Sequence, residues 1–301
     1  MKNNFKILLI VFIIFLYTNP MQAQDARMYL NVPRGTNVVQ FNVINSNSAM
    51  DNADGLENQI TDSKTYLPVY YYVFKGLWDR TASIGANVPI VDYFSYDKVS
   101  DSVLNDLVGM GDISLTLDHN FYGGMSMSKE EFAKTPPRNF AGIHLVFTIP
   151  TGSYNPSNTT NIGSNRYALK ILLQQSFILN KATAWLDIYA SATIYWNNDD
   201  YEGSNTLSQN AIYKLYTYYS QNIASPKTWA EIGMVYSYGG DIFINGAEQV
   251  GNQSTIQGAL GLSATIWKKG TIRALYMPTF YDNRANFHRG YSVQFRYQQL
   301  F

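Results

Sequence analysis

The sequence alternates between apolar and polar side chains over most of its length, and this two-residue period continues to the last position. In the final stretch, YSVQFRYQQLF, one parity holds Tyr291, Val293, Phe295, Tyr297 and Phe301, and the other holds Ser292, Gln294, Arg296 and Gln298. Successive side chains of a β-strand point to opposite faces, so this pattern predicts a strand with one apolar and one polar face. A chain terminus usually frays in water. A terminal strand of this kind therefore indicates that its apolar face lies against an apolar surrounding.

About twelve segments share this alternation. They cover residues 36–44, 66–74, 81–90, 111–121, 142–150, 165–177, 184–196, 211–219, 229–238, 255–267, 271–278 and 291–301. In the second segment the pattern places Leu67, Val69, Tyr71 and Val73 on the apolar face and Tyr70 and Tyr72 on the polar face. The chain therefore predicts an all-β protein.

The connections between these segments differ in length in a regular way. Polar stretches of roughly 11–20 residues, among them 45–64, 91–108, 197–210 and 239–252, alternate with connections of mostly 2–8 residues. The exception is residues 122–139, where Ser128 and Glu131 have the spacing of a capping box and predict a short helix. Long loops at one end and short turns at the other are typical of outer-membrane barrels, whose short turns are periplasmic.

These features together predict a transmembrane antiparallel up-and-down β-barrel of about 12 strands. An even number of strands returns the chain to the side on which it started, so both termini are expected in the periplasm. Aromatic residues near strand ends match the girdles of a membrane barrel; the tryptophans are Trp78, Trp185, Trp196, Trp229 and Trp267. Mean hydropathy is only −0.18. Alternating strands average out in such a value, so it does not argue against membrane-spanning strands.

A soluble β-sandwich or a secreted barrel is the rival architecture, because its strands also alternate. That architecture predicts a core rich in Leu, Val and Ile and no regular asymmetry of the loops. Here the polar parity carries charges on many strands, although charged residues make up only 15% of the chain against a usual quarter. The membrane barrel fits this combination better.

The N-terminus carries the pattern of a secretory signal. Lys2 and Lys6 precede the apolar run ILLIVFIIFLY (7–17), and a polar stretch that allows cleavage after Ala23 follows. The apolar run is well short of the roughly 20 residues that a spanning helix needs; an uncleaved N-terminal anchor is the alternative. We therefore expect a signal peptide over residues 1–23, an extended periplasmic lead over 24–35 and an outer-membrane barrel over 36–301.

Four stretches resemble one known family. They are VPRGTNVV (32–39), GMGDISL (109–115), FTIPTGSY (147–154) and NIGSNRYALK (161–170). Their order and spacing are similar to those of the outer-membrane barrels of the MetA-pathway of phenol degradation family. The resemblance implies a bacterial outer-membrane channel, porin-like, that takes up small hydrophobic or aromatic compounds. The last residue, Phe301, likewise resembles the C-terminal signal that the outer-membrane insertion machinery reads.

The polar parity predicts which side chains face the lumen. The lumen or pore candidates are Asp112, Asp118, His144, Arg166, Lys170, Asp187, Tyr189, Lys214, Glu231, Arg273 and Arg296. Tyr70, Tyr72, Tyr195, Tyr216 and Tyr218 are expected beside them as amphipathic surfaces for a solute. Charges of mixed sign argue against a strongly ion-selective pore. They either pair with one another and stiffen the barrel, or form a polar constriction that positions a solute.

Other classes of function have less support in the sequence. The chain has 22 basic and 22 acidic residues and no cysteine, which gives no indication of a nucleic-acid partner, a thiol nucleophile or a thiolate metal site. Its three histidines stand in no spacing that marks a nucleophile or a metal site, so neither a catalytic residue nor a cofactor is expected. The expected partners are outer-membrane lipids and small solutes. A non-conducting structural or surface-recognition barrel remains the alternative, and an outer-membrane hydrolase is a more distant one.

Overall fold

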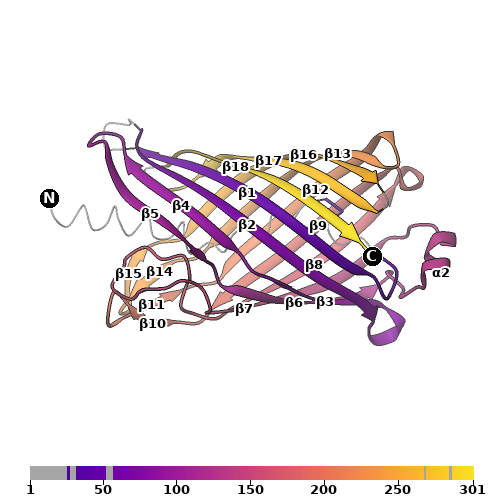
Figure 1. The fold of residues 1–301 in the computed structure, drawn as a ribbon, viewed down its shortest axis with the longest axis horizontal. Coiled ribbons are helices and arrows are strands. Elements are labelled where there is room, and N and C mark those ends of the chain that lie inside the picture. The colour runs from indigo at the N-terminus through magenta and orange to yellow at the C-terminus, as the bar shows by residue number, and fades with distance from the viewer. Residues whose placement is uncertain (1–25, 28–31, 52–56, 268, 285–286) are drawn as a thin grey trace.

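The computed structural model describes residues 26–27, 32–51, 57–267, 269–284 and 287–301, and over these residues the chain forms a closed barrel (Figure 1). Its strands are β1 (Asn37–Asp51), β2 (Glu57–Lys75), β3 (Thr81–Asn87), β6 (Ile113–Tyr122), β7 (Phe140–Ile149), β8 (Ala168–Leu179), β9 (Ala184–Tyr195), β12 (Ile212–Ser225), β13 (Thr228–Gly239), β16 (Gln253–Trp267), β17 (Gly270–Asp282) and β18 (Phe287–Leu300). Each strand pairs antiparallel with its neighbours along the chain, and β1 closes the barrel by pairing with both β2 and β18. The predicted up-and-down barrel of about 12 strands is confirmed.

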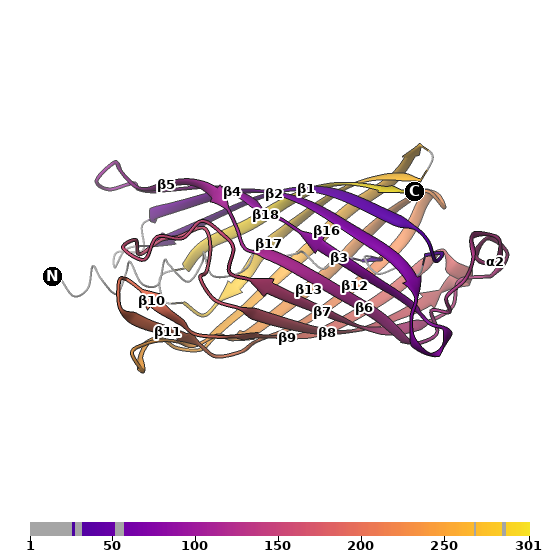
Figure 2. The same ribbon diagram turned by 60° about the horizontal axis from the view of Figure 1, so that its bottom comes forward.

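Several predicted loops at one end of the barrel are in fact β-structure. Strands β4 (Ile90–Asp97) and β5 (Ser102–Met110) form a hairpin beyond the rim, where β4 pairs with the first half of β2. Strands β10 (Asn198–Tyr201), β11 (Asn205–Gln209), β14 (Ile242–Ile244) and β15 (Ala247–Val250) form a second, four-stranded sheet at the same end (Figures 1 and 2). The sequence predicted loops here because these segments are polar. Strands that lie outside a membrane need no continuous apolar face, so polar segments can form them.

The opposite end carries the short connections and the C-terminus (Figure 1). Two of the connections contain the 3-10 turns η1 (Leu77–Asp79) and η2 (Asn180–Ala182), and the longest contains α2 (Lys129–Lys134). The predicted capping box is confirmed: Ser128 Oγ accepts from the Glu131 N–H at 3.2 Å, and Glu131 Oε2 accepts from the Ser128 N–H at 2.7 Å. The Ser128 N–H bond, helped by the Ser128 hydroxyl, lowers the pKa of Glu131.

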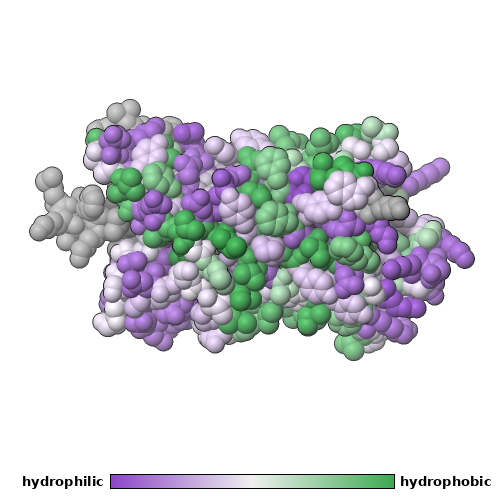
Figure 3. All heavy atoms as spheres, in the orientation of Figure 1, coloured by the Kyte–Doolittle hydropathy of each residue, from purple (hydrophilic) through white to green (hydrophobic). Residues whose placement is uncertain are grey.

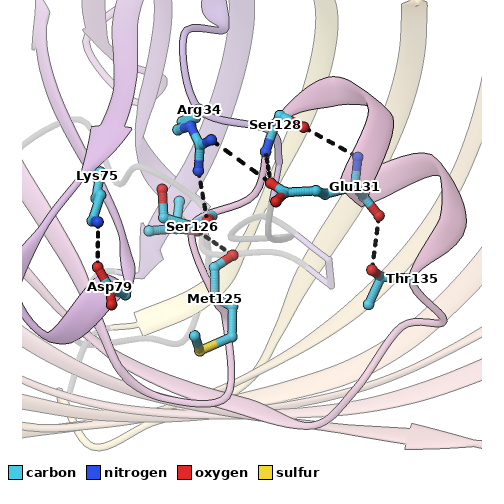
Figure 4. Close-up of polar contacts among 9 residues, drawn as sticks. Arg34, Lys75, Asp79, Met125, Ser126, Ser128, Glu131 and Thr135 are labelled. Atoms are coloured by element: carbon cyan, nitrogen blue, oxygen red, sulfur yellow. Dashed lines mark hydrogen bonds and ion pairs between the residues drawn. The ribbon is translucent and has the colours of Figure 1, made fainter.

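The first strand is fastened to the α2 connection by Arg34 (Figure 4). Its guanidinium donates to the Ser126 carbonyl at 3.1 Å and lies 3.7 Å from the Glu131 carboxylate. Beside it in the same view, Lys75 and Asp79 form an ion pair across the β2–β3 turn. These contacts hold the first three strands and the connection between β6 and β7 together at this end.

Side-chain direction follows the predicted parity on most strands. On β6, Leu115 and Leu117 are each 46% exposed on the outside, whereas Ser114 and Thr116 between them are buried inside. On β18, Phe295 is exposed, and Gln294 and Arg296 are buried inside. The residue after that strand, Phe301, is also exposed.

The prediction for β2 is wrong. Val69 and Tyr71 face the interior, and Tyr70 and Tyr72 face outward at 46% and 41% exposure. Pairing with β1 explains the inversion: Val39 lies directly opposite Tyr70, and paired residues share a face of the sheet. The run of tyrosines leaves both parities of β2 partly apolar, so alternation alone could not distinguish its faces.

The outer surface carries an apolar band. Figure 3 shows hydrophobic side chains gathered over the middle of the barrel and hydrophilic ones toward its two ends. The band includes exposed residues of several barrel strands, among them Ile84, Leu115, Leu173, Leu215, Ile232, Leu260 and Phe295. Exposed apolar area on this scale, around a closed sheet that leaves no backbone edge in the band, is what a bilayer requires.

Two predictions fall wholly or partly outside the described residues. The signal peptide, residues 1–23, is outside them, as is half of the lead before β1, residues 24–25 and 28–31. Within the described residues, no helix combines the length and the apolar character needed to cross a membrane.

Leu115 tests the assignment of the outer face. Leu115→Arg should lower the free energy of unfolding of the barrel in lipid vesicles by about 2–4 kcal/mol if the site lies near the bilayer midplane. Urea titration in vesicles measures that loss.

The matched control for this variant is Ser114→Arg, one residue away on the inner face beside a cavity. It should cost clearly less than Leu115→Arg. Equal losses from the two variants would contradict the assigned direction of the β6 side chains.

Candidate functional site in the barrel interior

A belt of hydrogen-bonded polar side chains runs around the inner wall near the α2 end of the barrel. We call it the polar belt; it comprises Asn42, Ser83, Asp118, His144, Gln174, Ser176, Asp187, Glu231, Arg273 and Arg296. These residues come from β1, β3, β6, β7, β8, β9, β13, β17 and β18. The belt therefore joins strands that are distant in sequence.

One part of the belt is a chain of bonds from β3 to β8. Ser83 donates to Asp118 at 2.6 Å, and the other Asp118 oxygen lies 2.8 Å from His144 Nδ1. His144 Nε2 lies 2.6 Å from Gln174 Oε1. Both ring nitrogens of His144 are thus engaged with the wall, which gives this histidine a structural place in the belt rather than that of a general base.

The belt continues through β9 to the N-terminal part of the chain. Gln174 donates to Ser176 at 3.0 Å, and Ser176 in turn donates to Asp187. The second Asp187 oxygen accepts from the backbone N–H of Arg27 at 2.9 Å. Two residues of the predicted lead, Ala26 and Arg27, therefore lie inside the barrel.

Ala26 forms hydrogen bonds with side chains on another part of the wall. Its N–H donates to Glu231 Oε2 at 2.9 Å, and its carbonyl accepts from Arg273 at 3.0 Å. Glu231 and Arg273 also form an ion pair with each other across β16. A Cβ at Gly261 on β16 would lie 2.0 Å from Glu231 Oε1, so only glycine leaves room for this pair.

The Arg27 side chain packs against the inner wall of the barrel. It donates to Ser220 and Asn222 at 2.8 Å each. Its guanidinium lies 3.7 Å from the ring centroid of Trp185 and 5.2 Å from that of Trp229, in reach of cation–π attraction. Ala26 and Arg27 thus close part of the lumen at the polar belt, and we call them the internal segment.

An apolar cluster lies beside the internal segment. Ala26 packs with Leu172, Tyr189, Tyr216, Tyr218, Val235, Ala259, Leu275 and Met277. The rings of Tyr189, Tyr216 and Tyr218 lie 6.0–6.3 Å from one another in the two contacting pairs. These tyrosines are inside the barrel as predicted, but Tyr189 and Tyr218 are fully buried as packing groups.

The internal segment and the apolar cluster beside it narrow the lumen, and we call this place the constriction. Two cavities occupy the interior on either side of it. The one toward the α2 end has a volume of about 390 Å³ and is lined by Arg27, Asp118, His144, Arg273 and Arg296, among others. The other, of about 270 Å³, opens toward the second sheet; its lining includes Lys170, Tyr195, Lys214, Tyr216 and Asp282. We call the second one the upper cavity. Most predicted lumen residues thus border one of these two spaces.

Asp112 faces the upper cavity but serves as an anchor for a loop. Its Oδ1 accepts from the Gly152 N–H at 2.8 Å, and its Oδ2 accepts from both the N–H and the hydroxyl of Ser164, the former at 2.8 Å. A Cβ on Gly152 would lie 2.7 Å from the Gly163 Cα, so these two backbones approach too closely for larger residues. Three of the four sequence stretches that indicated a family therefore meet at one junction.

Arg166 also has a structural place. It is buried, its guanidinium lies 4.5 Å from the Tyr195 ring centroid, and it donates to Gln209 of β11. It thus connects the end of the barrel wall to the second sheet. The sequence predicted Arg166 as a lumen or pore candidate; in the structure it is buried and bonded to the second sheet.

No group of three or more His, Asp or Glu side chains suited to a metal ion occurs among the residues that the structure describes. The carboxylates of the belt are instead bonded to Arg, Ser, His and backbone N–H groups.

Comparisons with known proteins agree with this architecture. The family described as "Putative MetA-pathway of phenol degradation" matches residues 41–297. An outer membrane channel from Pseudomonas putida F1 is 21% identical, with a TM-score of 0.78 over 92% of this chain and 99% of that one. The transport unit of the autotransporter AIDA-I from Escherichia coli is 10% identical, with a TM-score of 0.55 over 98% and 96%. Comparison with the curated proteins gives no match.

The contacts of the internal segment predict how it is held. The chain has no cysteine, so an Ala26→Cys variant carries a single thiol. That thiol should react slowly with a polar maleimide in the folded protein. Replacing both acceptors, Asp187→Ala with Glu231→Ala, should speed the reaction by roughly tenfold or more, since hydrogen bonds to charged groups are worth about 1.5–3 kcal/mol.

A Lys134→Cys variant on exposed α2 is the control for this labelling experiment, and its rate should be the same with and without the two carboxylates. Circular dichroism should verify that the barrel stays folded. Equally fast labelling of Ala26→Cys in both backgrounds would mean that the carboxylates do not hold the internal segment.

The loop junction gives a separate prediction. Asp112→Ala removes the acceptor of the bonds to Gly152 and Ser164, so amide hydrogen exchange in residues 150–164 should become roughly tenfold faster. Asp106→Ala, an exposed carboxylate on nearby β5, should leave that exchange unchanged. Unchanged exchange in both variants would rule out the anchoring role of Asp112.

Proposed function

The chain belongs to the MetA-pathway of phenol degradation family, and from that membership we propose that it is an outer-membrane channel that passes small hydrophobic or aromatic solutes passively. The observation that carries the proposal is the interior: two cavities lie in line inside a closed barrel, separated by a constriction of aromatic and polar side chains. A barrel that served only as a scaffold would need no such spaces.

The size of the spaces favours small solutes. Pockets for drug-sized ligands are about 300–1,000 Å³. One cavity, of about 390 Å³, lies near the lower end of that range, and the other, of about 270 Å³, lies below it. Tyr216 of the apolar cluster lines the upper cavity and gives a hydrophobic solute an aromatic surface next to the constriction. The mixed charges of the polar belt are paired with one another, so they favour no ion of a single sign.

We propose the following orientation in the membrane. Both termini and the α2 connection face the periplasm, and the β4–β5 hairpin and the second sheet face the outside, as for barrels whose short turns are periplasmic. The signal peptide is removed near Ala23 after export, and Phe301 is the group that the insertion machinery reads. A solute then enters through the upper cavity, passes the internal segment and leaves through the cavity beside α2.

In this proposal the internal segment limits the rate of passage. Ala26 and Arg27 occupy the constriction and are held by hydrogen bonds to five side chains of the wall: Asp187, Ser220, Asn222, Glu231 and Arg273. Solute must pass around this segment or displace it. The same closure is the one observation that favours the second candidate, a non-conducting structural or surface-recognition barrel. No arrangement of the belt supports a hydrolase, since His144 is bonded at both nitrogens.

Passive passage has a direct test. Liposomes that contain the refolded protein should swell or load faster than empty liposomes when presented with small aromatic alcohols and acids, with faster entry for smaller solutes. Removing Asp187 and Glu231 should increase the rate, since the segment at the constriction loses its anchors. Entry equal to that of empty liposomes for every solute, in both the parent and the variant, would favour the non-conducting barrel.

A further inference from the structure

Two lysines point into the upper cavity from strands on either side of β9. Lys170 is on β8 and Lys214 is on β12, and both line the cavity. The register places Thr193 opposite Lys170 and Ser191 opposite Lys214, so the two lysines flank β9 on the inner wall, two residues apart in register. Their positive charges repel each other across β9.

Neither ammonium group has an acidic partner among the residues that the structure describes. The carboxylates of the described residues that line the same cavity are those of Asp112 and Asp282. Asp112 accepts bonds from Gly152 and Ser164, and Asp282 forms a two-point ion pair with Arg284. Two half-buried charges of one sign without a counter-charge are unfavourable, because partial burial removes some of the water that would solvate them. The polar belt below shows the opposite arrangement, with its arginine and carboxylate bonded together.

Aromatic and apolar surfaces complete the lining around the lysines. The Lys170 ammonium lies 5.8 Å from the ring centroid of Tyr216, and Tyr195 lies on the same wall. Val146 and Ile212 contribute apolar area to the cavity. The lining thus offers two cations at one place and a surface for a nonpolar body next to it.

From this arrangement we propose that the upper cavity contains a binding subsite for compact organic anions, with a carboxylate held between Lys170 and Lys214 and an aromatic or apolar body against Tyr195 and Tyr216. This inference rests on the proposed function and names the preferred solute class: monocarboxylic acids with a hydrophobic body. A carboxylate supplies the missing counter-charge and removes the repulsion between the two ammonium groups. An inorganic anion would satisfy the charge but leave the aromatic surface unused.

The two lysines also favour the capture of anions on one side of the constriction. A cation pair at the entrance side of the constriction attracts anions from solution, and a site that binds weakly still releases them onward. The apolar cluster formed by Tyr216, Leu172 and their neighbours begins next to the subsite, so the hydrophobic body of the solute already touches the path that leads to the constriction.

Binding, measured separately from passage, tests the subsite. Benzoate, its neutral analogue benzyl alcohol, and inorganic phosphate should each be titrated by calorimetry into the refolded protein in detergent. We expect benzoate to bind more tightly than either of the other two. Lys170→Gln and Lys214→Gln should each weaken benzoate binding by roughly tenfold or more, as expected for loss of one charge-assisted bond, and leave benzyl alcohol unchanged. Lys227→Gln, at an exposed turn at the other end of the barrel, should change neither.

The outcomes separate this inference from the proposed function. Entry of benzyl alcohol into liposomes without any benzoate binding would overturn the subsite and leave the channel intact. Benzoate binding that is lost in the lysine variants, in a protein that passes no solute, would support the subsite and overturn the channel. Equal binding of benzoate and phosphate would contradict the role of the tyrosine surface. Resistance to urea should be compared among the three variants, and a Lys→Arg substitution at each position should restore benzoate binding if charge is the cause.

Discussion

Closure of the main sheet is the constraint on which the rest of this structure depends. A backbone N–H or C=O group in hydrocarbon has no water to bond to, so a sheet in a membrane can have no free edge. Here β1 meets that requirement by pairing with β18 along nearly its whole length and with β2 on its other side. Once the sheet is closed, each strand has one face toward lipid and one toward an enclosed space. Polar side chains on the inner face are then stabilised by partners on the wall or by water in that space.

The structure meets this second requirement in two different ways. At the polar belt, partners from separate strands bond to one another, and glycine at position 261 gives Glu231 and Arg273 room to meet. At the loop junction, Asp112 bonds to backbone N–H groups and fixes a loop instead. The upper cavity is the exception, because Lys170 and Lys214 remain without a counter-charge among the described residues. Such local exceptions to otherwise satisfied polarity are where function is expected.

Much of this arrangement could be predicted from the sequence because membrane strands have a two-residue period. The alternation of apolar and polar residues predicted the barrel, and the spacing of the capping box predicted α2. Alternation could not show which face of β2 points inward, because its consecutive tyrosines are apolar enough for either face. Pairing with β1 decides the direction. Alternation also could not find the internal segment, since Ala26 and Arg27 lie in no strand and their partners are more than a hundred residues away. The glycine-containing stretches could be recognised in the sequence, but only the tertiary structure shows that they meet at Asp112.

The position of the internal segment has a consequence for assembly. Its partners are Asp187, Glu231 and Arg273, on β9, β13 and β17, so residues 26 and 27 are held by strands that are synthesised much later. During synthesis and export, residues 26 and 27 emerge long before any of those strands exists. The bonds of Ala26 to Glu231 and Arg273 can therefore form only after β13 and β17 have joined the wall. A barrel that lacks its last strands would hold residues 26 and 27 with fewer bonds, so the constriction is complete only when the wall is complete.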